Sequence, residues 1–429
     1  MIALARPSRL DRPPIWAVVM QHVEEAAHLG HVRSLYLRAP DVRLLHLGRL
    51  DERLAAHLDG VAVAGVYGRR LADRALERLG GGEIFVATVR ALEEGDANRV
   101  DQLLAITQTV SSVRPGLLAA FGWVSASSLR GIVMPLLERA PPWPREVALA
   151  SCAMHAVNPG FSVTRALEAD DERLRARALR FAGQCGRREL IGNCRAALAD
   201  TDEYCAFEAA RSALLLGDRS NSLLSLEALA VGNVRVSPTN DAALRVLLKV
   251  VSAKTARAIL ASLAKDPAQI RSVIRGIAMA GDPHYVPWLM AQMEDPKLAR
   301  LAGEAFSFIT GVDPAYLDLE GQPLQDFGPS ADPNDQKVSM DEDDSLPWPD
   351  RAKLHAWWKQ NGSRFKPGIR YFIGDQPTSQ KCLEVLQTGF QRQRIAAAEY
   401  RALLNPGTPV FNVTAPSWRQ RRLLAQITA

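Results

Sequence analysis

The sequence predicts an all-α protein with an array of stacked helix pairs at its centre, an N-terminal helical cap and a small C-terminal module. Glycines recur at predicted helix ends: Gly186, Gly217, Gly281 and Gly311 lie 31, 64 and 30 residues apart. Alanine and leucine keep a helical period before these glycines, and Asp-Pro pairs stand at the joints. A period near 31 residues is typical of stacked helical hairpins, and a hydrophobic content of 47% is that of a folded globular chain.

Two helical runs predict the cap. The first spans residues 15–39 and ends before Pro40, and the second starts at Arg49 and ends near Gly60. We expect Asp51, Glu52 and Arg53 on the solvated side of the second run. Further on, residues 80–82 are three glycines before the apolar run 83–92, and because neither a phosphate-binding lysine nor a preceding strand accompanies them, they favour a flexible loop.

The two clearest repeat copies align without a gap. DERLRARALRFAGQCG starts at Asp171, and DEYCAFEAARSALLLG starts at Asp202. Their matching apolar residues form one helix face ahead of a capping glycine: Leu174, Ala178, Ala182 and Cys185 in the first copy, and Cys205, Ala209, Ala213 and Leu216 in the second. Alanine on this face allows neighbouring helices to approach closely.

Weaker copies precede Gly281 and Gly311, and the joints carry three capping candidates, Asp266, Asp282 and Asp295, each followed by proline. The pattern resembles HEAT-like repeats of the short, alanine-rich kind. This resemblance implies a solenoid with an extended concave surface that binds a large partner. A compact all-α bundle is the other interpretation of the same period.

The predicted organisation has four parts: an N-terminal helical cap over 1–110, HEAT-like repeats over 111–311, an acidic linker over 312–345 and a basic, tryptophan-containing module over 346–429. The linker acids are Asp332, Asp335, Asp341, Glu342, Asp343 and Asp344. They favour a solvated spacer over a calcium site. From Arg351 onward, thirteen Lys or Arg face three acids, so this tail carries +10 and could pair with the linker in a salt-sensitive way.

The C-terminal module contains the stretch LPWPDRAKLHAWWKQNG, with Trp348, Trp357 and Trp358. Asp350 or Pro349 is expected to open its helix and Gly362 to end it. The favoured interpretation is that these tryptophans dock on the last repeat. The alternative is an exposed aromatic and basic surface for a partner.

No catalytic, cofactor-binding or metal-ligating set is predicted. A helix face with Glu24, His28 and His31, near His22 and Glu25, has ligand-like spacing but lacks the HExxH order and a distant ligand. Five cysteines without a CxxC pair are expected to be reduced thiols. The apolar run 15–20 is too short for a signal sequence, and no run approaches the roughly 20 apolar residues that cross a bilayer. We therefore expect a cytoplasmic, non-enzymatic protein without a membrane partner.

One repeat carries a basic cluster, whose members of interest are Arg173, Arg177, Arg180, Arg187 and Arg188. A nucleic-acid-binding solenoid would extend such a stripe over several repeats. Because the other repeats carry few such residues, the sequence disfavours a nucleic-acid partner. These arginines and the three tryptophans are the predicted partner-binding residues.

Several stretches together resemble one family. They are HVEEAAHL, RLDERLAAHLDG, FSFITGVDPAYLDLEG, VSMDEDDSLPWPDRAKLHAWW and RFKPGIRYFIGDQPTSQKCLEVLQTGFQRQRIAAAEYRALLNPGTPVFNVTAPSWRQ. The chain resembles an uncharacterised HEAT-like family encoded beside type VI secretion genes in proteobacteria. The resemblance implies neighbours that include effector, spike and PAAR-like proteins, and it supplies no catalytic residues.

Three functional hypotheses follow. The first is a non-enzymatic adaptor or chaperone that binds an effector or a spike or PAAR-like protein through the solenoid surface. The second is an immunity protein that neutralises a co-encoded toxin. The third is a nucleic-acid-binding HEAT-like solenoid, and a salt-dependent shift of duplex DNA would identify it.

Overall fold

The structure is a computed structural model that describes residues 14–232, 237–322 and 342–428. In those residues the chain forms 22 α-helices, and only isolated β-bridges, with no strand, occur among them. The prediction of an all-α fold is confirmed. No helix in these ranges is both long enough and apolar enough to span a bilayer.

By its contacts the chain falls into two compact units, and each is described by itself. Unit 1 comprises Met1–Arg38, Leu44–Val163 and Thr414–Ala429, and unit 2 comprises Ala39–Arg43 and Thr164–Val413. The four-part division stays a prediction about domains. The contacts assign its last part, 346–429, to both units, because the final helix belongs to unit 1.

Unit 1 is built around an antiparallel helix pair near the N-terminus. Its helices are α1 (Trp16–Tyr36), α2 (Leu44–Val63), α3 (Val66–Ala75), α4 (Gly81–Glu94), α5 (Ala97–Thr109), α6 (Arg114–Trp123), α7 (Val133–Leu137), α8 (Pro142–His155) and α22 (Ser417–Thr428), and α9 (Ser162–Leu167) lies at the unit boundary in the sequence. Helix α1 packs on α2, α3 and α4, and α22 packs on α2. Both predicted helices of the cap are present, although the second continues beyond Gly60 to Val63.

The predicted glycine loop is wrong. Gly81 and Gly82 form the first turn of α4, where a β-carbon on Gly82 would overlap the Ala27 carbonyl of α1. Likewise, a β-carbon on Gly116 would overlap the Gly81 carbonyl. The glycines allow close helix packing rather than a flexible connection.

Asp51 is buried, contrary to the predicted solvated position, whereas Glu52 and Arg53 are exposed. Its carboxylate accepts hydrogen bonds from Arg33 Nε at 2.7 Å and from the Ser417 N–H at 2.6 Å. A carboxylate at the N-terminus of α22 satisfies an N–H group that has no partner within that helix. Asp51 therefore ties α1, α2 and α22 together.

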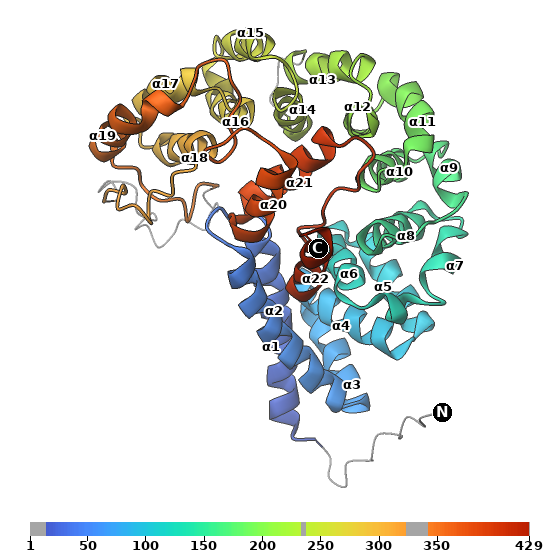
Figure 1. The fold of residues 1–429 in the computed structure, drawn as a ribbon. Coiled ribbons are helices and arrows are strands. Elements are labelled where there is room, and N and C mark those ends of the chain that lie inside the picture. Colours follow the sequence, from blue (N-terminus) through green and yellow to red (C-terminus); the bar gives the residue numbers. More distant parts are fainter. Residues whose placement is uncertain (1–13, 233–236, 323–341, 429) are drawn as a thin grey trace. The chain divides into compact units, whose positions relative to one another are not determined.

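Unit 2 contains a curved series of helices (Figure 1). Its helices are α10 (Glu172–Gln184), α11 (Ile191–Ala196), α12 (Glu203–Leu216), α13 (Asn221–Val231), α14 (Pro238–Leu248), α15 (Ala253–Leu263), α16 (Ile270–Ala280), α17 (Val286–Gln292), α18 (Ala299–Thr310), α19 (Arg351–Asn361), α20 (Ser379–Thr388) and α21 (Gln391–Leu404). Helices α10, α12, α14, α16 and α18 pack side by side in that order, and α11, α13, α15 and α17 alternate with them along the chain.

The two aligned copies become the neighbouring helices α10 and α12. Asp171 caps α10 by accepting from the Leu174 N–H, and Asp202 caps α12 by accepting from the Cys205 N–H. The predicted face is buried in both, with Cys185 alone half-buried: Leu174, Ala178, Ala182, Cys185, Cys205, Ala209, Ala213 and Leu216. Asp266, Asp282 and Asp295 accept local backbone N–H groups, as predicted for the joints.

The repeat-end glycines have a second role beyond ending helices. All four adopt the left-handed conformation that glycine tolerates best: Gly186, Gly217, Gly281 and Gly311. They also lie under residues 368–410, which we call the covering segment. A β-carbon on Gly281 would overlap the Tyr371 carbonyl, and one on Gly186 would overlap the Gly407 carbonyl.

We predict that Gly281→Ala destabilises unit 2 more than Gly368→Ala. Both positions are left-handed, with φ of +66° and +86°, so each change costs about 1–2 kcal/mol of backbone strain. Around Gly368 no heavy atom lies closer than 4.0 Å to an added β-carbon. Only Gly281→Ala also displaces Tyr371, which adds about 1–3 kcal/mol. Urea unfolding measures the difference, hydrogen exchange of residues 371–374 locates it, and equal losses would contradict this account.

Candidate functional site

The covering segment lies against the carboxyl ends of the helices in unit 2. Its backbone N–H groups donate to carbonyls in or next to the last turns of α18, α16, α12 and α10. The bonds are Ile373 to Phe308 at 2.7 Å, Tyr371 to Gly281 at 2.8 Å, Gly407 to Leu215 at 2.9 Å and Val410 to Gln184 at 2.9 Å. Since a helix leaves its last carbonyls without an internal partner, the segment satisfies groups that would otherwise need water.

Two arginines complete this edge with their side chains. Arg370 Nη2 donates to the carbonyl of Leu248, the last residue of α14, at 2.9 Å and to the Val251 carbonyl just beyond that helix at 2.6 Å. Arg219 Nη2 donates to the Leu403 carbonyl at the end of α21, at 2.5 Å. Cations are favoured at helix carboxyl ends, where partial negative charge accumulates. The basic composition of the tail therefore has a structural use within unit 2.

A buried ion-pair centre joins α21 to α12 and α14. Glu399 accepts hydrogen bonds from Lys249 Nζ at 2.6 Å and from Arg211 Nε at 2.9 Å. Burial raises the pKa of the Glu399 carboxyl, but the two cations outweigh burial and hold its pKa at about 2. Next to it, the Tyr400 hydroxyl donates to the Met279 carbonyl of α16 at 2.7 Å, and burial raises the pKa of that hydroxyl.

A cavity of about 200 Å³ opens beside this centre. It is lined by Arg219, Lys249, Val250, Arg370, Pro377, Tyr400, Leu403 and Leu404. Three of these side chains are cations, and none is an acid. Tyr400 and Lys249 are buried, whereas Leu404 is 44% exposed and lies at the rim. The cavity therefore combines a cationic lining with apolar walls.

The predicted tryptophans lie half-buried in unit 2. Trp357 and Trp358 of α19 contact Phe306 of α18 edge-on, with ring centroids 5.8 and 6.3 Å apart, and Trp358 stacks on Phe365. The Arg300 guanidinium lies 4.7 Å from the centre of the Trp348 ring. These contacts agree with the docking interpretation, because α18 is the last helix of the series.

The predicted arginines fall into two groups. Arg173 is exposed, and Arg177 and Arg180 are half-exposed on α10. Arg187 pairs with Glu189, and Arg188 donates to the Pro406 carbonyl of the covering segment. The structure thus brings Arg188 to the covering segment, whereas on α10 Arg173 is exposed and Arg180 pairs with Glu208 of α12 at 3.9 Å.

Glu342 and Asp343 of the linker pair with arginines of α16, whereas Asp318 of the same linker pairs with Lys353 of the tail, with 3.4 Å between the Asp318 carboxylate and Lys353 Nζ. Asp343 accepts from Arg271 at 2.7 Å, and Glu342 accepts from Arg275. A second tail residue, Arg392, donates to the backbone carbonyl of Glu342 at 2.8 Å. Asp332, Asp335 and Asp341 lie outside the described residues.

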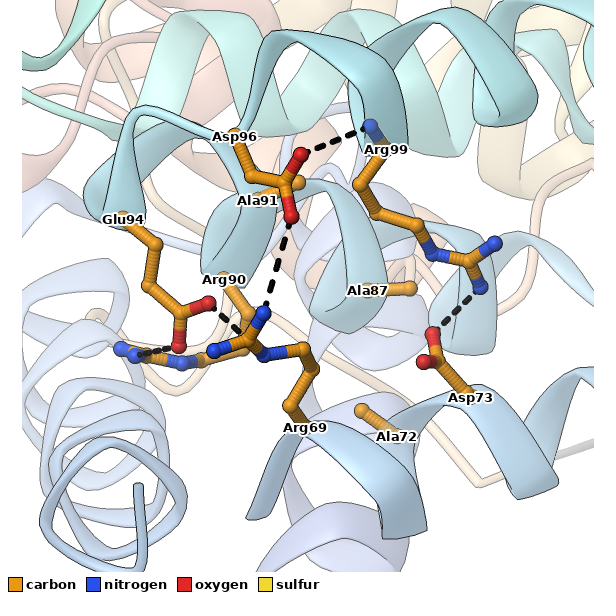
Figure 2. A pocket seen from close by; sticks show the side chains of 9 residues that line it. All are labelled: Arg69, Ala72, Asp73, Ala87, Arg90, Ala91, Glu94, Asp96 and Arg99. Carbon is orange, nitrogen blue, oxygen red and sulfur yellow. Dashed lines mark hydrogen bonds and ion pairs between the residues drawn. The ribbon is translucent and has the colours of Figure 1, made fainter. Parts of the chain in front are cut away.

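Unit 1 contains a depression walled by three arginines and three acids from α3, α4, α5 and the turn between α4 and α5 (Figure 2). The charged residues are Arg69, Arg90, Arg99, Asp73, Glu94 and Asp96. Glu94 pairs with Arg90 at 2.7 Å and with Arg69 at 3.0 Å, and Arg99 pairs with Asp73. The space left between them does not admit a water molecule. This cluster joins the three helices and leaves no room for a ligand.

The candidate histidine face does not gather ligands. His28 and His31 are exposed, while His22 turns its Nδ1 toward Nδ1 of His57 on α2, 3.1 Å away. Burial and His22 lower the pKa of His57. Across the described ranges, no group of three or more His, Cys, Asp or Glu side chains has the geometry to hold a metal ion. All five cysteines are free thiols.

Sequence reasoning missed the ion-pair centre and the cavity. Glu399 offered one signal, because it is one of three acids in a basic tail and lies within the apolar run IAAAEYRALL. Its partners Arg211 and Lys249 lie 188 and 150 residues away, so no local pattern points to them.

No protein-family model matches the chain, and no curated protein is significantly similar to it in sequence.

We predict that Glu399→Ala destabilises unit 2 by about 3–5 kcal/mol, because it leaves two cations buried without their carboxylate. Glu384→Ala is the matched control, since the Glu384 side chain in α20 is 57% exposed and pairs with Lys381 at the protein surface. The control should cost less than about 1 kcal/mol. Chemical denaturation of the full chain measures both, and a small loss for Glu399→Ala would show that the centre contributes little.

The same centre predicts a pH dependence. The pKa of Glu399 is about 2 in the fold and near its ordinary 4.5 in the unfolded chain. Its contribution to stability is therefore complete above about pH 4.5 and disappears as the pH falls toward 2. The difference in unfolding free energy between the unaltered chain and Glu399→Gln should shrink over that range. A constant difference from pH 6 to pH 2.5 would contradict the assignment.

Proposed function

We propose that this chain is a non-enzymatic accessory protein of a type VI secretion cluster that acts as an adaptor or chaperone for an effector or a spike or PAAR-like protein. In this proposal unit 2 is a HEAT-like solenoid. The serial packing of α10, α12, α14, α16 and α18 supports it, because such a series presents extended surfaces suited to a large partner.

The covering segment limits which surface of unit 2 a partner protein can bind. It occupies the carboxyl ends of α10, α12, α16 and α18, so a partner has to use another part of the solenoid. On α10 it meets Gln184, beyond Arg173, Arg177 and Arg180. These three arginines and Tyr204 of α12 form what we call the Arg-Tyr surface.

The Arg-Tyr surface is the observation that carries the proposal. Tyr204 is 43% exposed, and its hydroxyl donates to Glu208 at 3.0 Å. Burial and Glu208 raise the pKa of this hydroxyl, whereas the charges of Arg180 and Arg177 lower it, and Arg180 also pairs with Glu208 at 3.9 Å. Arginine and tyrosine are the residues most enriched at energetically important interface positions. The surface suits an acidic patch on a protein partner.

We predict that replacing Arg173 and Arg177 together by glutamate weakens capture of the partner at least about tenfold. The matched control replaces Lys254 and Lys265 by glutamate, which makes the same charge change at exposed positions of unit 2. The tagged full chain is purified from its native host, and bound proteins are identified by mass spectrometry. Equal capture by both variants would rule out the Arg-Tyr surface.

The identity of the captured protein separates the hypotheses. Recovery of an effector, spike or PAAR-like protein supports the accessory role, and secretion should then require this chain. Recovery of a single toxin, with loss of its toxicity on co-expression, supports an immunity protein instead. A preparation that recovers none of these proteins counts against the proposal.

A further inference from the structure

We propose that the cavity beside Glu399 binds a small ligand through a phosphate group. This inference concerns a site separate from the Arg-Tyr surface and goes beyond the proposed accessory function. It rests on the charge, the unused hydrogen-bond donors and the shape of the cavity within unit 2.

The net positive charge of the cavity lining favours an anionic ligand. Arg219, Lys249 and Arg370 line it, and no acid does. Even if the whole charge of Glu399 is assigned to Lys249, two positive charges remain. The helix carbonyls that accept from Arg219 and Arg370 are neutral, so they solvate these cations without cancelling their charge. A phosphate monoester carries close to two negative charges at neutral pH.

Donors remain for such an anion. Hydrogen bonds within the described residues use Nε and Nη2 of Arg370 but not Nη1. Lys249 Nζ donates to Glu399 and keeps two further N–H groups. Guanidinium and ammonium groups that converge on one space are the usual protein ligands of phosphate.

The walls indicate that the phosphate is carried by an organic group. The Tyr400 hydroxyl is already bonded to the Met279 carbonyl, so its ring offers only an apolar surface. Val250, Pro377 and Leu403 extend that surface. A volume of about 200 Å³ exceeds what an inorganic phosphate ion needs. The structure therefore favours a phosphate monoester with a small apolar or planar portion.

Phenyl phosphate is a suitable probe, because it joins a dianion to one aromatic ring. Isothermal titration calorimetry of the full chain at low ionic strength should detect saturable binding of this probe, and benzoate should bind at least about tenfold more weakly. Tighter binding of phenyl phosphate than of inorganic phosphate identifies an organic monoester as the ligand, and equal binding identifies free phosphate. No binding of either at millimolar concentration would overturn the proposal.

Variants at the rim of the cavity distinguish a loss of ligand binding from a loss of folding. Leu404 lies at the exposed end of α21 and forms none of the bonds that hold the covering segment to the helix ends. Leu404→Asp should weaken phenyl phosphate binding at least about tenfold by repulsion, and Leu404→Asn should change it by less than about threefold. Arg219→Gln should also lose binding, and its unfolding curve shows whether it remains folded. Equal affinity in all variants would show that the probe binds elsewhere.

Discussion

Unpaired carbonyls at helix carboxyl ends are the constraint on which unit 2 depends. Each helix leaves its last four carbonyls without an internal partner, and the packed series brings the ends of five helices to one segment of the chain. The covering segment donates hydrogen bonds to these carbonyls, from backbone N–H groups at α10, α12, α16 and α18 and from the Arg370 guanidinium at α14. Close backbone contact requires glycine at Gly186 and Gly281. The repeat period and the covering segment are thus parts of one arrangement.

In unit 1 it is the amino end of a helix whose unpaired backbone groups are satisfied by another part of the chain. The α22 N-terminus presents the Ser417 N–H to the buried carboxylate of Asp51, and Arg33 balances that charge. Arg33 also donates to the Thr414 carbonyl just before α22. In each unit, a segment from the last quarter of the chain is held by a buried carboxylate and by helix-end groups. Both units therefore need the C-terminal region in order to be complete.

The sequence allowed accurate prediction where the deciding interactions are local. The helical class, the first helix and the buried face that contains Leu174 and Ala209 follow from a period of 3.6 residues, and the Asp caps follow from contacts within three residues. Asp51 was misplaced because its partner Ser417 lies 366 residues away. The glycines at 81 and 82 were misread because their neighbour is another helix rather than the next turn.

The candidate site could not be predicted from the sequence, because its residues are likewise far apart along the chain. Glu399 becomes meaningful only beside Arg211 and Lys249, which come from two earlier helices. The position of the tryptophans was easier to predict, because aromatic residues on one side of a short basic helix already favour docking of that helix on the repeats. Their contact with Phe306 required α19 to return to the last helix of the series, and only the three-dimensional structure shows that return.

The two charged clusters differ both in the balance of their charges and in the space that they enclose. In the cluster of Figure 2 three arginines face three acids, opposite charges pair, and no space remains between them. In the cavity of unit 2 three cations line a space of about 200 Å³ without a lining acid, and Glu399 balances the charge of Lys249 alone among them. Neutral carbonyls hold Arg219 and Arg370 in place without removing their charge, whereas Lys249 is paired with the Glu399 carboxylate. Like charges gathered at an opening to solvent are stabilised when an anion binds between them. The balanced cluster of unit 1 has no such need, so of the two only the cavity of unit 2 is suited to an anionic ligand.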